Sequence, residues 1–249
     1  MIAYFEIFLH YQGWLYLVLL SMLEVVLGID NVIFISIITD KMSAPELKKR
    51  ARSLGLTLAL IIRFVLLGML SLLIHLIEPI YTPWFGAFNY EDLVLLVGGL
   101  FLIYKSTLEM HKSVKSTSED TPKKELSFRS VVLQIVLVDL VFSFDSVISA
   151  IGMTSGMEEE LHVNPIMIVY FSVLISMLIM IRFSGIISDF IQRNPTIKTI
   201  ALSFLLMIGV FLVAEAFGNR IPKGYVYFGF GFSMFVELLN MRIRKNHSN

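Results

Sequence analysis

Residues 14–38 read WLYLVLLSMLEVVLGIDNVIFISII. Glu24 and Asp30 are the charged residues of this stretch, and every other position is apolar or uncharged. A helix of about 20 apolar residues is long enough to cross the hydrocarbon core of a bilayer. The stretch therefore predicts a transmembrane helix that carries two carboxylates inside the membrane.

The composition of the whole chain agrees with a membrane protein. Of its 249 residues, 56% are hydrophobic and 16% are charged, whereas roughly a quarter of the residues of a soluble domain are charged. We predict an all-α, polytopic protein with seven transmembrane helices, at residues 14–38, 54–77, 91–110, 131–152, 166–187, 199–217 and 224–241.

Several classes of protein and site are excluded at this stage. The absence of cysteine excludes disulfides and thiolate metal sites. The net charge of +0 gives no reason to expect a nucleic-acid partner. The first residues lack a basic region and a cleavage site, so we expect no removable signal peptide. The expected partner is the lipid bilayer, and no permanently bound cofactor is expected.

Lysine and arginine positions predict the orientation, because these residues concentrate on the cytoplasmic side of a membrane protein. They cluster at residues 41–52, 105–129, 182–198 and 242–245. On the opposite side, the N-terminus and the loops 78–90 and 153–165 contain none, and Arg220 and Lys223 are the exceptions. We therefore predict a multi-pass membrane protein with its N-terminus outside and its C-terminus in the cytoplasm.

An internal repeat divides the chain. Residues 24–34 read EVVLGIDNVIF and residues 139–149 read DLVFSFDSVIS, so each has a carboxylate, five residues and then an aspartate followed by a small polar residue. A weaker echo relates residues 99–103 to residues 209–213. The copies lie in the first and fourth spans, so the repeat unit is three spans. Because this number is odd, the second copy is inverted, as in many secondary transporters.

The predicted organisation follows from this repeat. Residues 1–110 form the first three-helix repeat, and residues 111–130 form a cytoplasmic linker. Residues 131–218 form the second, inverted repeat, and residues 219–249 add a seventh helix and a cytoplasmic tail.

The intramembrane acids of the two motifs are the candidate site. A carboxylate buried in a membrane is costly and usually faces the bundle interior, where it marks a pathway or a partner. Carboxylate, amide and hydroxyl oxygens are ligands for hard divalent cations. The predicted metal ligands are Glu24, Asp30, Asn31, Asp139, Asp145 and Ser146. Neighbouring carboxylates also favour proton binding, so exchange of protons for metal is a natural coupling.

Helical geometry complicates this prediction. Asp30 follows Glu24 by six positions, which places their side chains about 120° apart on a straight helix. A break at Gly28 would aim both acids inward and free backbone carbonyls as ligands. Ser143 takes the place of Gly28 in the second copy, so a break there has less support.

A structural interpretation of the same acids stays open. Arg63 lies inside the second span and would be a partner for one of them, although one arginine does not neutralise four carboxylates. Arg63 is equally interpreted as a charge that helps to expel a bound ion. For Glu215 and Glu237, each of which occurs once, we favour a structural role.

The sequence also resembles a known family. The stretches LEVVLGIDNVIFIS (23–36), GGLFLIYKSTLEMHK (98–112) and LVDLVFSFDSVISAIGM (137–153) are similar to the TerC family of membrane proteins. A fourth similar stretch covers residues 201–240. The resemblance implies inverted three-helix halves and a relation to LysE-type exporters, and several members resemble manganese exporters. It implies that Glu24, Asp30, Asp139 and Asp145 hold the ion.

The predicted function is export of a divalent metal ion, manganese (Mn²⁺), across a bacterial inner membrane. Such export serves metal homeostasis. The alternative is a membrane scaffold or metal-delivery partner of secretion machinery, with a role in metal or tellurite resistance. No enzyme is expected, since residues 28–30 fall short of the GxGD motif of intramembrane aspartyl proteases.

Overall fold

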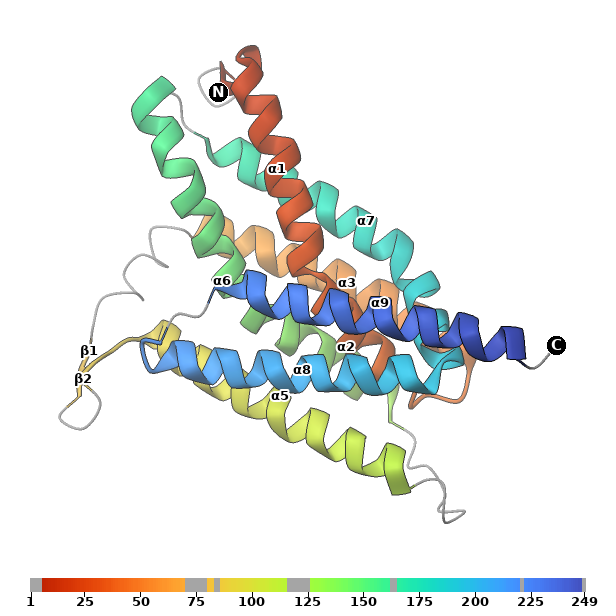
Figure 1. Cartoon of the computed structure of the whole chain (residues 1–249). Coiled ribbons are helices and arrows are strands. Elements are labelled where there is room, and N and C mark those ends of the chain that lie inside the picture. The colour runs from red at the N-terminus through yellow and green to blue at the C-terminus, as the bar shows by residue number, and fades with distance from the viewer. Residues whose placement is uncertain are drawn as a thin grey trace. The chain divides into compact units, whose positions relative to one another are not determined.

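The computed structural model describes residues 6–69, 80–82, 86–115, 126–161, 165–219 and 222–247 (Figure 1). Helices dominate these residues, as predicted, and a short antiparallel hairpin accompanies them. The helices are η2 (Glu6–Leu9), α1 (Tyr11–Leu27), α2 (Ile29–Thr39), α3 (Pro45–Gly68), α5 (Tyr90–Lys115), α6 (Phe128–Leu161), α7 (Ile166–Arg193), α8 (Pro195–Ala216) and α9 (Lys223–His247). The hairpin pairs β1 (Ile80–Thr82) with β2 (Gly86–Phe88).

In the described part of the chain, five helical stretches are long and apolar enough to cross a membrane: Tyr11–Thr39, Pro45–Gly68, Tyr90–Ser113, Ile166–Arg193 and Pro195–Ala216. They confirm a polytopic membrane protein. The predicted spans 131–152 and 224–241 coincide with α6 and α9, and their membrane crossing stays a prediction. The second predicted span is helical to Gly68, and residues 70–77 lie outside the described residues.

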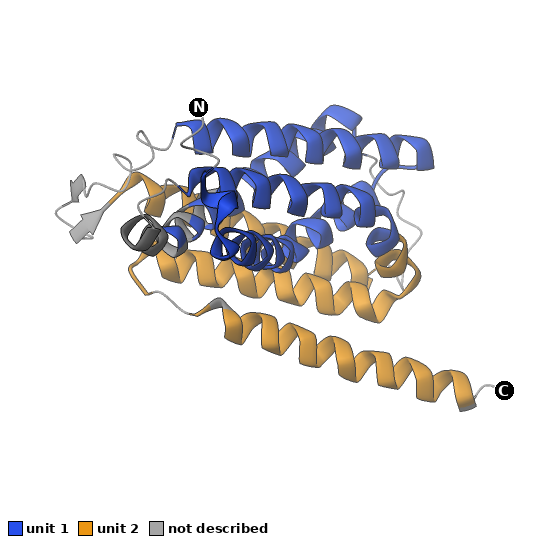
Figure 2. Ribbon diagram, turned by 90° about the horizontal axis from the view of Figure 1, so that it is seen from above, with its two compact units in different colours: residues 1–75, 125–188 blue, residues 76–124, 189–249 orange. Residues whose placement is uncertain are grey.

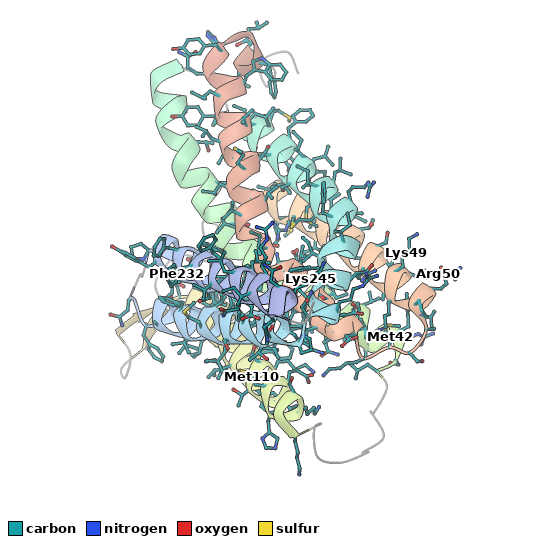
Figure 3. The ribbon with its side chains drawn as sticks, turned by 45° about the vertical axis from the view of Figure 1, so that its right-hand side comes forward. Met42, Lys49, Arg50, Met110, Phe232 and Lys245 are labelled. Carbon is teal, nitrogen blue, oxygen red and sulfur yellow. The ribbon has the colours of Figure 1, made fainter. Side chains whose placement is uncertain are left out.

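Large apolar side chains point outward from several helices. Trp14, Val18 and Met22 form an exposed row on α1. Phe232 of α9 is 60% exposed, and Figure 3 shows its side chain among the outward-facing aromatic residues. Exposed apolar surface of this extent is typical of a protein that is solvated by lipid.

The chain folds into two compact units, and each contains helices from both predicted repeats (Figure 2). Unit 1 comprises Met1–His75 and Glu125–Ser188, and it holds α1, α2, α3, α6 and most of α7. Unit 2 comprises Leu76–Lys124 and Asp189–Asn249, and it holds α5, α8 and α9.

Helix α2 is the innermost helix of unit 1. Every residue from Asp30 to Thr39 is buried, which is what a helix that is hydrophobic on all sides requires. The Ser36 hydroxyl donates to the Ser188 hydroxyl at 3.1 Å, so α2 is also bonded to α7. Helices α3 and α6 approach closely at Gly55, where a Cβ atom would lie 2.7 Å from Ile135 Cγ2. The acids at the start of α2 are thus enclosed by protein.

Unit 2 is built on a reciprocal contact between two glycines. A Cβ atom on Gly99 of α5 would lie 2.7 Å from the Gly209 carbonyl oxygen. A Cβ atom on Gly209 of α8 would lie 2.9 Å from the Gly99 carbonyl oxygen. The fourth residue after each glycine completes the contact, since Val213 lies against Gly99 and Ile103 lies against Gly209. Small residues allow such close backbone approach between membrane helices.

We expect Gly99→Ala to destabilise unit 2 by about 1–3 kcal/mol, because its methyl group meets backbone that has no room to yield. Thermal unfolding of the purified protein in detergent measures the effect. Gly229→Ala in α9 is the control, since a Cβ atom there meets nothing within 4 Å. Equal melting temperatures for the two variants would contradict the close contact.

Candidate functional site

The first acidic motif straddles an interruption in its helix. Helix α1 ends at Leu27 and α2 begins at Ile29, with Gly28 between them at φ −89° and ψ 0°. The Gly28 N–H donates to the Glu24 carbonyl at 2.9 Å, and the Gly28 carbonyl accepts from the Val32 N–H at 3.1 Å. The predicted break at Gly28 is therefore present, but the carbonyls of Glu24 and Gly28 are engaged and are not free ligands.

Met180 of α7 explains why a glycine stands at this interruption. The Met180 sulfur lies against Gly28, in the space that a Cβ atom would occupy. The Met180 side chain is buried there. Since a thioether is flexible and polarisable, it fills an irregular gap of this kind well. No pattern in the sequence distinguishes Met180 from the other methionines.

Arg63 of α3 is at the centre of the acidic cluster. Its Nε donates to Asp139 Oδ2 at 3.1 Å, and its Nη2 donates to Asp139 Oδ1 at 2.8 Å. Its Nη1 donates to Glu24 Oε2 at 3.0 Å. All three side chains are at most 2% exposed. The structure therefore ties the first acid of each motif to a single buried arginine.

Asp139 is further bonded to both motifs. Its Oδ1 accepts from Asn31 Nδ2 at 3.1 Å, and its Oδ2 accepts from the Ser143 hydroxyl at 2.9 Å. Helix α6 runs without interruption through Ser143, so the break at Gly28 has no counterpart in the second motif. The spacing of four residues between Asp139 and Ser143 is the sequence signal for this bond, and it was missed.

The remaining predicted ligands are partly described. Asp30 is buried, accepts the Asn31 N–H at 2.9 Å, and lies near enough to Arg63 for charge attraction. Ser146 is buried beside the Glu24 carboxylate and donates to the Ser143 carbonyl at 3.3 Å. Asp145 lies within α6, and its side chain is outside the described residues.

Two buried oxygens of the first motif, Glu24 Oε1 and Asn31 Oδ1, and the nearby Ser21 Oγ have no hydrogen-bond partner among the described residues. Buried polar atoms are normally satisfied, so such acceptors point to a missing water or cation. The described side chains, which exclude Asp145, contain no group of three acids or histidines that is arranged for a metal ion. The structure therefore brings together Glu24, Asn31, Asp139 and Ser146, but not a complete ligand set.

The sequence of the chain identifies the family to which it belongs. The sequence matches the integral membrane protein TerC family over residues 9–249. The chain belongs to the TerC family.

This TerC-family chain is similar to several inner membrane proteins. It is 43% identical to the inner membrane protein YoaE of Escherichia coli (strain K12) over 94% of this chain and 43% of YoaE. It is 40% identical to a UPF0053 protein of Haemophilus influenzae and 39% identical to the inner membrane protein YgdQ of Escherichia coli, in each case over 94% of this chain and 95% of the relative. The chain thus spans less than half the length of YoaE, and no solved structure gives a significant match.

Glu215 and Glu237, for which we favoured a structural role, lie in unit 2 of this TerC-family protein and outside both acidic motifs. Glu237 of α9 accepts hydrogen bonds from Arg244 and, at 3.5 Å, from Asn240. These contacts fit the structural role that we favoured for Glu237. Glu215 is half-buried near the end of α8, and its role stays a prediction.

Proposed function

We propose that this TerC-family protein is a transporter that exports a divalent metal ion, with manganese as the ion. The observation that carries the proposal is the buried cluster of Glu24, Asp30 and Asp139 around one arginine. Three carboxylates and one guanidinium leave an excess of negative charge in an enclosed place, and such groups mark ion pathways in membrane proteins.

The donor atoms suit a hard cation. Glu24 Oε1 and Asn31 Oδ1 are buried acceptors without partners, and Asp30, Ser146 and Asp145 add oxygen donors in the same motifs. Oxygen ligands of this kind suit magnesium, calcium and manganese. The resemblance to manganese exporters selects manganese among them. The ion is cargo, and a site for cargo has to release it again.

The proposed architecture is seven helices in two inverted repeats plus one helix. Two observations support it. Equivalent glycines, Gly99 and Gly209, contact each other reciprocally. In unit 1, Asn31 contacts the first acid of the second motif, and its repeat equivalent Ser146 lies beside the first acid of the first motif. Such pseudo-symmetry is the basis of alternating access by rocking of one repeat against the other.

The direction and coupling of transport belong to the same proposal. The distribution of basic residues favours an orientation with the N-terminus outside and the C-terminus in the cytoplasm. Lys49 and Arg50, which Figure 3 labels, belong to one of the basic clusters and lie in the first two turns of α3. Protons are the proposed counter-ion, because clustered carboxylates that lose a cation readily bind protons instead.

Purified protein in liposomes tests this function. A manganese-sensitive dye inside the vesicles should report uptake of Mn²⁺ when the ion is added outside, at a rate above that of protein-free vesicles. A proton gradient across the vesicle membrane should change this rate of Mn²⁺ uptake if protons are exchanged for Mn²⁺. A protein that inserts correctly but moves no Mn²⁺ would contradict transport of that ion and would favour the scaffold alternative.

A further inference from the structure

We propose that Arg63 is an internal counter-ion of the cargo: it stays bonded to Asp139 throughout and yields Glu24 to the arriving metal ion. The inference rests on the proposed transport of a divalent cation. It gives the first acids of the two motifs different tasks, although the sequence repeat presents them as equivalent. Asp139 becomes a positioning residue, and Glu24 becomes a ligand.

The hydrogen bonds of Asp139 carry the first step. Oδ1 accepts from Arg63 Nη2 and Asn31 Nδ2, and Oδ2 accepts from Arg63 Nε and the Ser143 hydroxyl. An ionised carboxylate offers about four lone-pair positions. Arg63 and Asn31 occupy three of them, and the Ser143 hydroxyl, whose one proton is shared with the Asp139 backbone carbonyl, faces the fourth. Asp139 would have to break a two-bond, charge-assisted contact with arginine before it could bind a metal ion.

Glu24 is held much more loosely. Arg63 donates one hydrogen bond to Glu24 Oε2, and Glu24 Oε1 has no hydrogen-bond partner among the side chains that the structure describes. Asn31, whose amide nitrogen is fixed by Asp139, also presents its oxygen without a partner. An ion that bound these two oxygens would replace one arginine bond and would satisfy two buried acceptors.

The charges are consistent with this exchange. When all are ionised, the described acids Glu24, Asp30 and Asp139 carry three negative charges against the one positive charge of Arg63, a difference of −2. A divalent cation would neutralise that excess without removing Arg63 from Asp139. Because like charges repel, the retained guanidinium would also weaken the hold on the ion and so favour its release.

This arrangement predicts opposite effects for the two partners. Arg63→Gln removes the competing charge, so we expect Mn²⁺ to bind about tenfold more tightly, with slower turnover at saturating Mn²⁺. Asp139→Asn frees the guanidinium to hold Glu24, so we expect binding about tenfold weaker. In the double variant R63Q/D139N no guanidinium is left to hold Glu24, so the affinity should stay close to that of Arg63→Gln.

Equilibrium binding of Mn²⁺ to the purified full chain, followed by the electron paramagnetic resonance of the free ion, measures these affinities. Arg52→Gln is the control, because Arg52 is a second buried arginine of the same helix and its removal should not tighten binding. A structural role alone for Arg63 would weaken binding or leave it unchanged.

The outcomes separate this inference from the function on which it rests. If the double variant binds as weakly as Glu24→Gln, Asp139 is a direct ligand and the inference is wrong, while transport of the ion stands. The inference is also wrong if Arg63→Gln folds and binds no more tightly than the parent. If the parent itself binds no Mn²⁺, the proposed function fails and takes this inference with it.

Discussion

Asp30→Asn is expected to reduce Mn²⁺ transport in liposomes to the rate of protein-free vesicles. The substitution keeps the size and shape of the side chain and removes one negative charge from an enclosed site. Asp30 lies in the first turn of α2, where the positive end of the helix dipole stabilises a carboxylate. The charge of Asp30 is therefore stabilised inside the membrane, close to the other acids of the proposed site.

Glu215→Gln is the matched control for this experiment, because it also neutralises one carboxylate of an apolar helix, but in α8 of unit 2. We expect Glu215→Gln to transport at the parent rate. Both variants must insert and melt like the parent for the comparison to count. Transport by Asp30→Asn at the parent rate would remove Asp30 from the proposed site.

Arg63→Gln is expected to lower the free energy of unfolding of the metal-free protein by about 3–5 kcal/mol. Removing one partner of a buried ion pair leaves the other charge uncompensated, and here two carboxylates lose their partner. Thermal unfolding in detergent with a metal chelator present measures the loss. Added Mn²⁺ should then restore more stability to this variant than to the parent, since ligands stabilise the state that binds them.

Lys48→Gln is the control for stability in the same helix. Lys48 pairs with Asp40 at 3.4 Å, but both side chains are partly exposed, and such pairs contribute about 0–1 kcal/mol. Equal losses for Arg63→Gln and Lys48→Gln would show that the buried arrangement of Arg63 is wrong.

Much of the fold was predictable because a bilayer imposes length and hydropathy on each helix. The motif at residues 24–31 also predicted a break at Gly28, and the break is there. The short hairpin of β1 and β2 was not predicted, since two strands of three residues each are too short for a periodic pattern. The division into compact units was also unpredictable, because helices in a membrane associate through packing and hydrogen bonds that hydropathy does not encode.

For the site, the sequence identified the candidate residues but not the difference in hydrogen bonding between Glu24 and Asp139. Arg63 was recognised as an isolated charge in an apolar span. Which of the four acids it contacts depends on distances between helices, and the spacing of residues along the sequence does not determine these distances. The repeat made Asp139 and Glu24 equivalent, whereas Ser143 and Asn31 saturate only Asp139. Met180 escaped notice because its role arises from contact with Gly28, 152 positions away along the chain.

The reciprocal contact of Gly99 and Gly209 bears on how such a chain could arise. If its halves descend from one three-helix ancestor, that ancestor would have paired with an antiparallel copy of itself, in a dimer with a two-fold axis in the membrane plane. In such an isologous dimer each residue on the axis meets its own copy. A single glycine would then have served both sides of the crossing, and the fused chain inherited it twice.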